Sequence, residues 1–94
     1  MPAVRFIRTN RFLRAYRKLD EQHRDRVKKA LAQFVVDRSH PGLGVKRIRG
    51  TDMIWEMRAG RDIRVTFQYE ESNDSTSVIV LRNVGHHDPT LSNP

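Results

Sequence analysis

The spacing of apolar residues changes once along this chain, near residues 39–42, and that change restricts the possible folds. Before it, apolar residues recur every three or four positions, as on one face of an α-helix. After it, they alternate with polar residues, as in half-buried β-strands. The run Ser39-His40-Pro41-Gly42 explains the break, because proline disfavours helical geometry at the residue before it and glycine accepts turn geometry. The pattern predicts an α+β fold with its helices in the first half.

Two amphipathic helices are predicted, over residues 11–19 and about 21–37. Thr9, Asn10 and Asp20 precede these runs, and their side chains can accept hydrogen bonds from unpaired first-turn amides. Because almost no chain separates the two helices, they are expected to form a helical hairpin.

Five strands are predicted, at residues 3–8, 45–49, 53–58, 62–69 and 78–84, with an acidic turn at 70–77. A three-residue loop at 59–61 would place Arg58 opposite Asp62 and Glu56 opposite Arg64, so that opposite charges pair. The tail is expected to fray after Leu91. The order β-α-α-β-β-β-β predicts a helical hairpin packed on one antiparallel sheet.

Charge is the compositional feature that bears on function. Eighteen Lys and Arg face eleven Asp and Glu, which gives a net charge of +7. This balance favours an anionic partner, either nucleic acid or an acidic protein segment. The absence of cysteine excludes a disulfide scaffold, cysteine–zinc sites and thiol catalysis. Without a bilayer-length apolar run or a secretory signal pattern, a cytoplasmic protein with one domain over residues 1–94 is expected.

Four short segments in the second half carry a family resemblance. They are Val45-Lys46-Arg47-Ile48-Arg49-Gly50, Ile54-Trp55-Glu56-Met57-Arg58, Asp62-Ile63-Arg64-Val65 and Val84-Gly85-His86-His87-Asp88. In this order, and preceded in the sequence by a helical hairpin, they resemble the RelE/ParE superfamily of toxins over residues 6–88. The resemblance implies the RelE-like fold and a toxin that cuts messenger RNA on the ribosome, without metal or cofactor, and so inhibits translation. It also implies an antitoxin partner whose largely extended, often acidic segment covers the basic face.

The resemblance assigns catalytic roles to two residues. Arg64 matches an arginine that RelE-like nucleases use on the scissile phosphate, a role that suits a guanidinium because it stays charged and binds phosphate at two points. The alternative for Arg64 is a structural ion pair with Glu56. His87 matches a histidine near the C-terminus that acts as general acid in several subfamilies, and His86 is the alternative if the match is shifted by one residue.

The general base is unassigned. Some relatives carry a glutamate or histidine base between the helical hairpin and the second strand, but residues 41–50 here contain neither, and the tail lacks the tyrosine of many relatives. Glu56, Lys46 and the second tail histidine are the candidates, with Lys46 or Arg47 in the place of catalytic lysines. The wider RNA-binding set is Lys46, Arg47, Arg49, Arg58 and Arg61, which can equally be a solvated face or an antitoxin footprint.

Several alternatives stay open at this point. A ParE-like protein would inhibit DNA gyrase by binding and cleave nothing, and an inactive relative would only bind an antitoxin; fold alone does not separate these functions. A metal site at the tail histidines is disfavoured, because adjacent residues of an extended chain point opposite ways. Trp55 is a possible base-stacking residue, but its alternation with Met53 and Met57 favours core packing.

Overall fold

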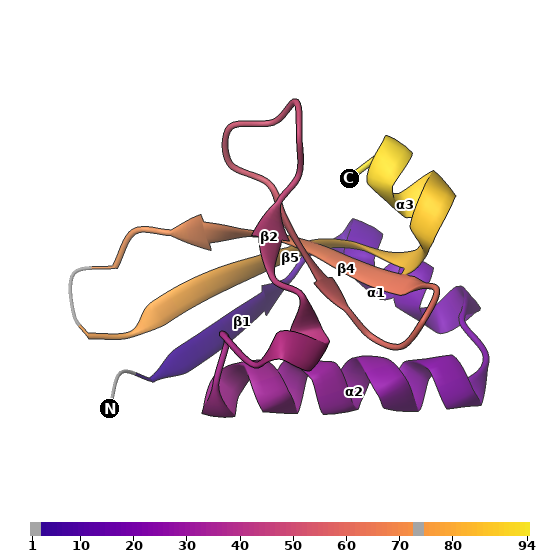
Figure 1. Ribbon diagram of the computed structural model, residues 1–94, viewed down its shortest axis with the longest axis horizontal. Helices are drawn as coiled ribbons and strands as arrows, with labels where there is room; N and C mark the ends of the chain where they lie inside the picture. The colour runs from indigo at the N-terminus through magenta and orange to yellow at the C-terminus, as the bar shows by residue number, and fades with distance from the viewer. Residues whose placement is uncertain (1–2, 73–74) are drawn as a thin grey trace.

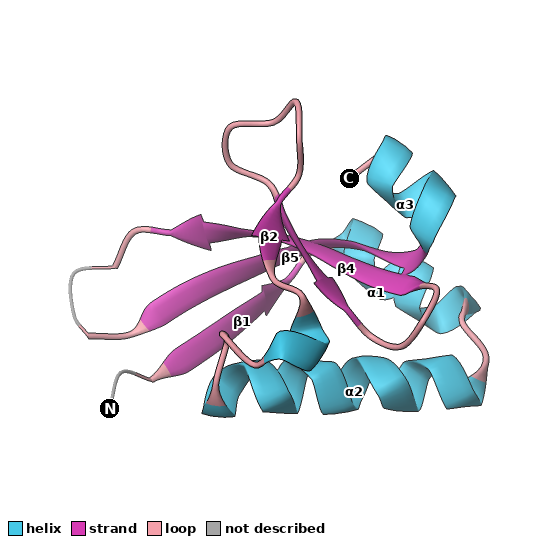
Figure 2. Ribbon diagram, in the orientation of Figure 1, coloured by secondary structure: helices cyan, strands magenta, loops and turns pink. Residues whose placement is uncertain are grey.

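The computed structural model describes residues 3–72 and 75–94, which form a five-stranded sheet with two longer helices on one face. A short third helix lies on the other face (Figures 1 and 2). The elements are β1 (Val4–Arg8), α1 (Asn10–Lys18), α2 (Glu21–Val36), the 3₁₀ turn η1 (Pro41–Leu43), β2 (Lys46–Arg47), β3 (Trp55–Arg58), β4 (Ile63–Glu70), β5 (Ser77–His86) and α3 (His87–Ser92). The predicted α+β class is confirmed. None of the helices in the described ranges is both long and apolar enough to cross a bilayer.

Both long helices begin at the predicted caps. The Thr9 hydroxyl accepts a hydrogen bond from Phe12 N–H at 3.1 Å, and the Asp20 carboxylate accepts one from His23 N–H at 2.8 Å. The Thr9 hydroxyl also donates to the Leu81 carbonyl at 2.8 Å, so this cap ties the start of α1 to β5. Capping therefore fixes where α1 begins and where it sits on the sheet.

The sheet has the strand order β1-β5-β4-β3-β2, and one of its pairings differs from the prediction. The four later strands pair antiparallel as expected, but β1 runs parallel to β5, so the sheet is mixed. The alternation within β1 sets which residues it buries and carries no information on the direction of a strand some 70 residues away. The predicted acidic turn at 70–77 includes Asn73 and Asp74, which lie outside the described residues.

The register of the β3–β4 hairpin also differs from the prediction. Ala59 N–H donates to Ile63 carbonyl at 2.9 Å, so the three-residue loop is 60–62 and not 59–61. Arg58 therefore lies opposite Arg64, and Glu56 lies opposite Thr66. Moving the loop by one residue keeps every side chain on its predicted face. Gly60 explains the position of the loop, because its φ of +101° suits glycine in a turn.

The core lies between the sheet and the two long helices. Phe34 of α2 packs edge-to-face on Phe67 of β4, with ring centroids 5.4 Å apart, and both side chains are buried. Trp55 is half-buried against this core and meets the Tyr69 ring at 5.4 Å, which confirms the predicted packing role. Met53, expected on the same face, is exposed.

The tail does not fray as predicted: residues 87–92 form α3, which packs on the second face of the sheet over β4 and β5. Gly85 permits this approach, because a Cβ at this position would lie 2.7 Å from Thr90 Oγ1. Beyond the helix, the main-chain oxygen of Pro94 accepts hydrogen bonds from Thr66 Oγ1 and Arg82 Nε, both at 3.2 Å. So short a helix shows no apolar period, which explains why the sequence pattern missed it.

Replacing Gly85 with alanine should loosen α3. Alanine in a strand gains about 0.5–1 kcal/mol over glycine in backbone entropy, but a contact of 2.7 Å forces a shift that typically costs about 1–3 kcal/mol. We expect lower stability in urea unfolding and faster amide exchange in α3. Adding Thr90→Ala removes the colliding atom. The double variant should therefore lose less unfolding free energy than the sum of the losses in the two single variants. Additive losses would contradict this account.

Candidate functional site

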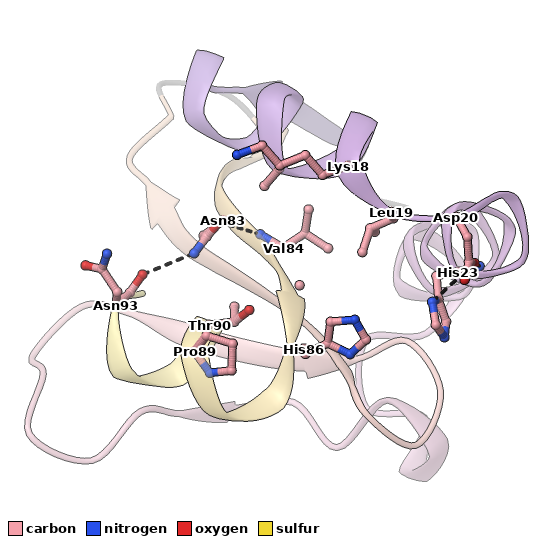
Figure 3. Close-up of a pocket in the computed structure, with 12 residues that line it drawn as sticks. Lys18, Leu19, Asp20, His23, Asn83, Val84, His86, Pro89, Thr90 and Asn93 are labelled. Carbon is pink, nitrogen blue, oxygen red and sulfur yellow. Dashed lines mark hydrogen bonds and ion pairs between the residues drawn. The ribbon is translucent and has the colours of Figure 1, made fainter.

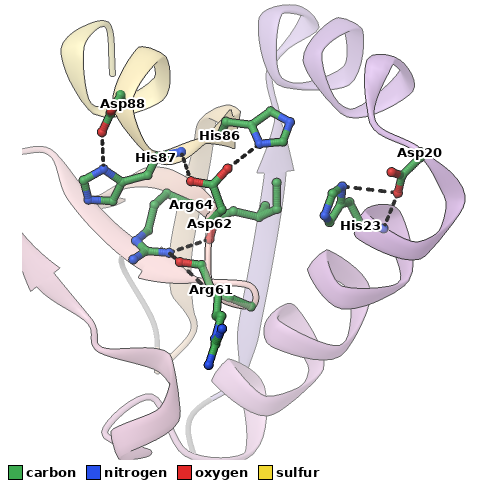
Figure 4. Close-up of polar contacts among 10 residues, drawn as sticks. Asp20, His23, Arg61, Asp62, Arg64, His86, His87 and Asp88 are labelled. Carbon is green, nitrogen blue, oxygen red and sulfur yellow. Dashed lines mark hydrogen bonds and ion pairs between the residues drawn. The ribbon is translucent and has the colours of Figure 1, made fainter.

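Arg64, the first candidate from the sequence, is buried in the second face of the sheet, with 8% of its surface exposed. Its Nη1 donates to three main-chain carbonyls around the hairpin loop: Gly60 at 3.3 Å, Arg61 at 3.2 Å and Ile63 at 3.0 Å. One end of the guanidinium thus braces the loop between β3 and β4 (Figure 4).

Glu56 supplies the counter-charge for Arg64. Its Oε1 lies 3.8 Å from Arg64 Nε, and both side chains are almost fully buried. The ion pair that the sequence offered as a structural alternative is therefore present. At this distance it is not a hydrogen bond, and Arg64 Nε is buried with no hydrogen-bond partner among the described residues. An unpaired buried donor is unfavourable, and this N–H could donate a hydrogen bond to an anionic oxygen.

Lys46 and Glu56 share a face of the sheet with Arg64. The ladder places Lys46 opposite Glu56 and Glu56 opposite Thr66, and directly opposed side chains point the same way. Arg64 is two residues before Thr66 on the same strand, so it points to that face as well. The structure thus brings together three residues that are far apart in the sequence.

A cleft of about 410 Å³ opens beside this group, between the loop after β2 and α3. Both flanking segments rise from the second face of the sheet (Figure 1). Its lining consists of Lys46, Arg47, Ile48, Arg49, Glu56 and Leu91. Three of the five residues predicted to bind RNA therefore line one cleft. Arg58 and Arg61 do not line it: Arg58 lies against Gly44, and Arg61 is exposed in the hairpin loop.

The side chains of the two tail histidines point in different directions at the start of α3. In the ladder, His86 lies opposite the buried Ile63 and so turns toward the helices, where its ring meets the His23 ring at 5.6 Å. Gly85, two residues before His87, lies opposite Arg64 in the ladder. The His87 side chain points to the other side of Asp62 from the His86 side chain (Figure 4). Its Nδ1 lies 2.8 Å from Asp88 Oδ1, and its side chain is 45% exposed. His87 is thus the tail histidine on the side of Arg64.

Asp62 is the site residue that the sequence reasoning missed. One of its carboxylate oxygens lies 2.5 Å from His86 Nδ1, and the other accepts a hydrogen bond from His87 N–H at 3.4 Å. The side-chain hydrogen bond from His86 lowers the pKa of the Asp62 carboxyl below its usual range. Asp62 so links the hairpin that Arg64 braces to the first turn of α3. No local pattern reveals a contact between residues 24 positions apart.

A larger cavity, of about 470 Å³, lies on the other side of His86, between the helices and α3 (Figure 3). Its charged lining is limited to Lys18, Asp20 and the histidines His23 and His86. With so few cations it is a poorer site for a polyanion than the cleft beside Lys46. Within residues 3–72 and 75–94, no three His, Cys, Asp or Glu side chains are arranged to hold a metal ion.

Solved structures share this arrangement of helices and strands. A YoeB/ParE toxin from Agrobacterium tumefaciens superposes with a TM-score of 0.69 at 10% identity, covering 87% of this chain and 96% of that one. A mutant of the E. coli toxin RelE in the free state superposes with a TM-score of 0.67 at 20% identity, covering 96% of this chain and 88% of that one. A chain of the RelB–RelE antitoxin–toxin complex from Methanococcus jannaschii superposes with a TM-score of 0.65 at 20% identity, covering 94% of this chain and 99% of that one.

The chain has the RelE fold. No protein-family model matches its sequence, and no curated protein matches it significantly. At these identities the similarity establishes the RelE-like architecture, and the chemistry has to be argued from the residues of this chain.

The link between Asp62 and His86 should be visible in titrations. A carboxyl whose pKa is lowered on folding adds stability above its ordinary pKa, and this contribution is lost as the pH falls through the lowered value. In the His86→Ala variant we expect the pKa of Asp62 to return toward its ordinary value. Carboxyl NMR signals recorded against pH measure this change. Asp37 is the internal control, because its lowered pKa comes mainly from hydrogen bonds with Ser39 and should not move. An unchanged Asp62 titration would show that the link does not form in solution.

Proposed function

We propose that this protein is a toxin of a toxin–antitoxin system, acting in the cytoplasm as a metal-independent endoribonuclease on messenger RNA at the ribosome. The observation that carries the proposal is the buried Nε of Arg64, which has no hydrogen-bond partner among the described residues. It lies on the same face as Lys46 and Glu56, close to a cleft lined with cations. A scissile phosphate would give this nitrogen the acceptor that it lacks. The similar solved structures are toxins by description, and they support the toxin part of this proposal.

The reaction needs three functions, and the residues on this face can supply each. The ribose 2′-oxygen attacks the adjacent phosphorus, and its proton passes to a base, for which Glu56 is our assignment. Arg64 and Lys46 stabilise the charge that develops on the phosphorane oxygens. His87 gives a proton to the departing 5′-oxygen as the P–O bond breaks. The products are a 2′,3′-cyclic phosphate and a free 5′-hydroxyl.

Glu56 is a better base than the alternatives that the sequence left open. His86 turns toward the helices, away from this face. Lys46 is exposed and lies opposite Glu56, so it fits the role of a cation on the phosphate. Glu56 can act once Arg64 turns to the phosphate, because its carboxylate is then no longer engaged by the guanidinium and is open to the 2′-hydroxyl.

The partner in this proposal is an antitoxin protein with an acidic segment. The net charge of +7 and the concentration of arginine and lysine in the cleft favour such a segment. Similar structures from Methanococcus jannaschii and Pyrococcus horikoshii are described as complexes of RelE with RelB. A chain that is disordered when free can wrap a wide basic surface of this kind.

Replacing either proposed catalytic residue should relieve growth arrest without abolishing antitoxin binding. We expect His87→Ala to slow RNA cleavage by about 10²–10⁴-fold through loss of the general acid. Arg64→Lys keeps the charge and loses the fork, so cleavage should fall by about 10²–10³-fold. His23→Ala is the matched control, a histidine on α2 outside the cleft. Thermal unfolding shows whether Arg64→Lys has lost the hairpin brace. Full toxicity in folded forms of both variants would refute the assignment.

Induced expression in a bacterial host separates this function from its rivals. We expect new messenger-RNA ends within translated codons, which disappear in the Arg64→Lys variant, while plasmid supercoiling stays normal. Growth arrest with intact transcripts and altered supercoiling would instead indicate a ParE-like inhibitor of gyrase. No arrest at all, with antitoxin binding retained, would indicate an inactive relative.

A further inference from the structure

A second basic pocket lies away from the proposed reaction centre. It has a volume of about 370 Å³ and lies between α2, the η1 turn and the β3–β4 hairpin. Its charged lining comprises Arg26 and Lys29 of α2, Arg58 of β3 and His40 before η1, and no aspartate or glutamate lines it. The cations come from three separate parts of the chain, so the fold and not a local charge run brings them together.

Glycines form the surface on which these cationic groups rest. A Cβ at Gly60 would lie 3.2 Å from Arg26 Cδ and 3.3 Å from its Nη1. A Cβ at Gly44 would lie 3.0 Å from Arg58 Nε. Both glycines have positive φ, so each is suited to its turn and also leaves room for a guanidinium against its Cα.

The imidazole of His40 is held in a similar way. Its Nδ1 accepts a hydrogen bond from Gly42 N–H at 3.0 Å, and a Cβ at Gly42 would lie 3.0 Å from the ring. The pocket is therefore also lined by an imidazole whose position is fixed by the turn that follows it.

The charges in this pocket lack the partners that other cations of the protein have. Arg64 has Glu56, and His86 has Asp62, but Arg26, Lys29 and Arg58 make no ion pair or hydrogen bond within the part of the chain that the structure describes. Three unpaired cations in one concavity repel one another, and an anion placed among them removes that cost.

We propose that this pocket binds a phosphate group of a nucleic-acid backbone. Two guanidinium groups and an ammonium can surround a tetrahedral phosphate, with each guanidinium offering paired donors. Arg58 lies opposite Arg64 in the β-ladder, so the strand that supplies Arg58 to this pocket adjoins the strand that carries Arg64. A backbone that carries one charge at every nucleotide can meet both places, whereas a peptide can do so only with closely spaced carboxylates. Binding here does not require cleavage, so it can be tested apart from the proposed function.

The test measures RNA affinity against salt for the full chain. The probe is a short, fluorescent single-stranded RNA with 2′-O-methyl groups, which the proposed reaction cannot cleave. The pocket variant is Arg26→Gln/Lys29→Gln, and the matched control is Arg14→Gln/Arg17→Gln, which removes two exposed charges from α1. Each lost phosphate contact lowers the slope of log K against log salt by about 0.7, so we expect a fall of about 0.7 for the pocket variant, which loses one bound phosphate. At about 0.1 M salt this corresponds to roughly fivefold weaker binding.

Inorganic phosphate gives a second readout that does not depend on the variants. Titrated into the wild-type protein, it should shift the amide NMR signals of Gly42, Gly44 and Gly60, and these shifts should vanish in the pocket variant. Equal effects of the two double variants on RNA affinity would overturn the proposal. So would a glutamate-rich peptide that shifts these signals when RNA does not, which would make the pocket a protein-binding site.

Discussion

The register of the β3–β4 hairpin is the constraint on which the candidate site depends. The hydrogen bond from Ala59 N–H to the Ile63 carbonyl sets the loop at residues 60–62. In this register Arg64 braces the loop carbonyls and lies diagonally from Glu56, and Asp62 reaches the tail histidines. A shift of two residues in the pairing would set Glu56 directly opposite Arg64 and Arg58 opposite Asp62, yet the main-chain ladder places Arg58 opposite Arg64. The fold therefore positions the proposed chemistry through main-chain hydrogen bonds rather than through the charges themselves.

The Glu56–Arg64 ion pair is expected to add little to the stability of the fold. Removing two charges from water costs several kcal/mol per ion, and a pair 3.8 Å apart without a hydrogen bond recovers little of this. An apolar pair of similar size would fill the same space at lower cost. In the function proposed above, a bound anion would supply the hydrogen-bond partner that the Nε of Arg64 lacks among the described residues.

The two faces of the sheet have different tasks. One face packs against α1 and α2 and holds the core around Phe34 and Phe67. The other carries Lys46, Glu56 and Arg64 and is partly covered by α3, which the absence of a side chain at Gly85 allows to approach. The basic pocket lies between α2, the η1 turn and the β3–β4 hairpin. A nucleic acid bound as we propose would contact both places.

The capped helices, the strands and the face to which each side chain points could be predicted from the sequence, because they follow from contacts within a few residues. The candidates Lys46, Glu56, Arg64 and His87 came from the family resemblance and not from these local patterns. The parallel pairing of β1 with β5, the contact of Asp62 with His86 in place of Arg58, and the folding of the tail as α3 required the tertiary structure. It also distinguished His87 from His86 by the face to which each turns. Each of these outcomes depends on groups 20 or more residues apart, whose relative energies no local pattern encodes.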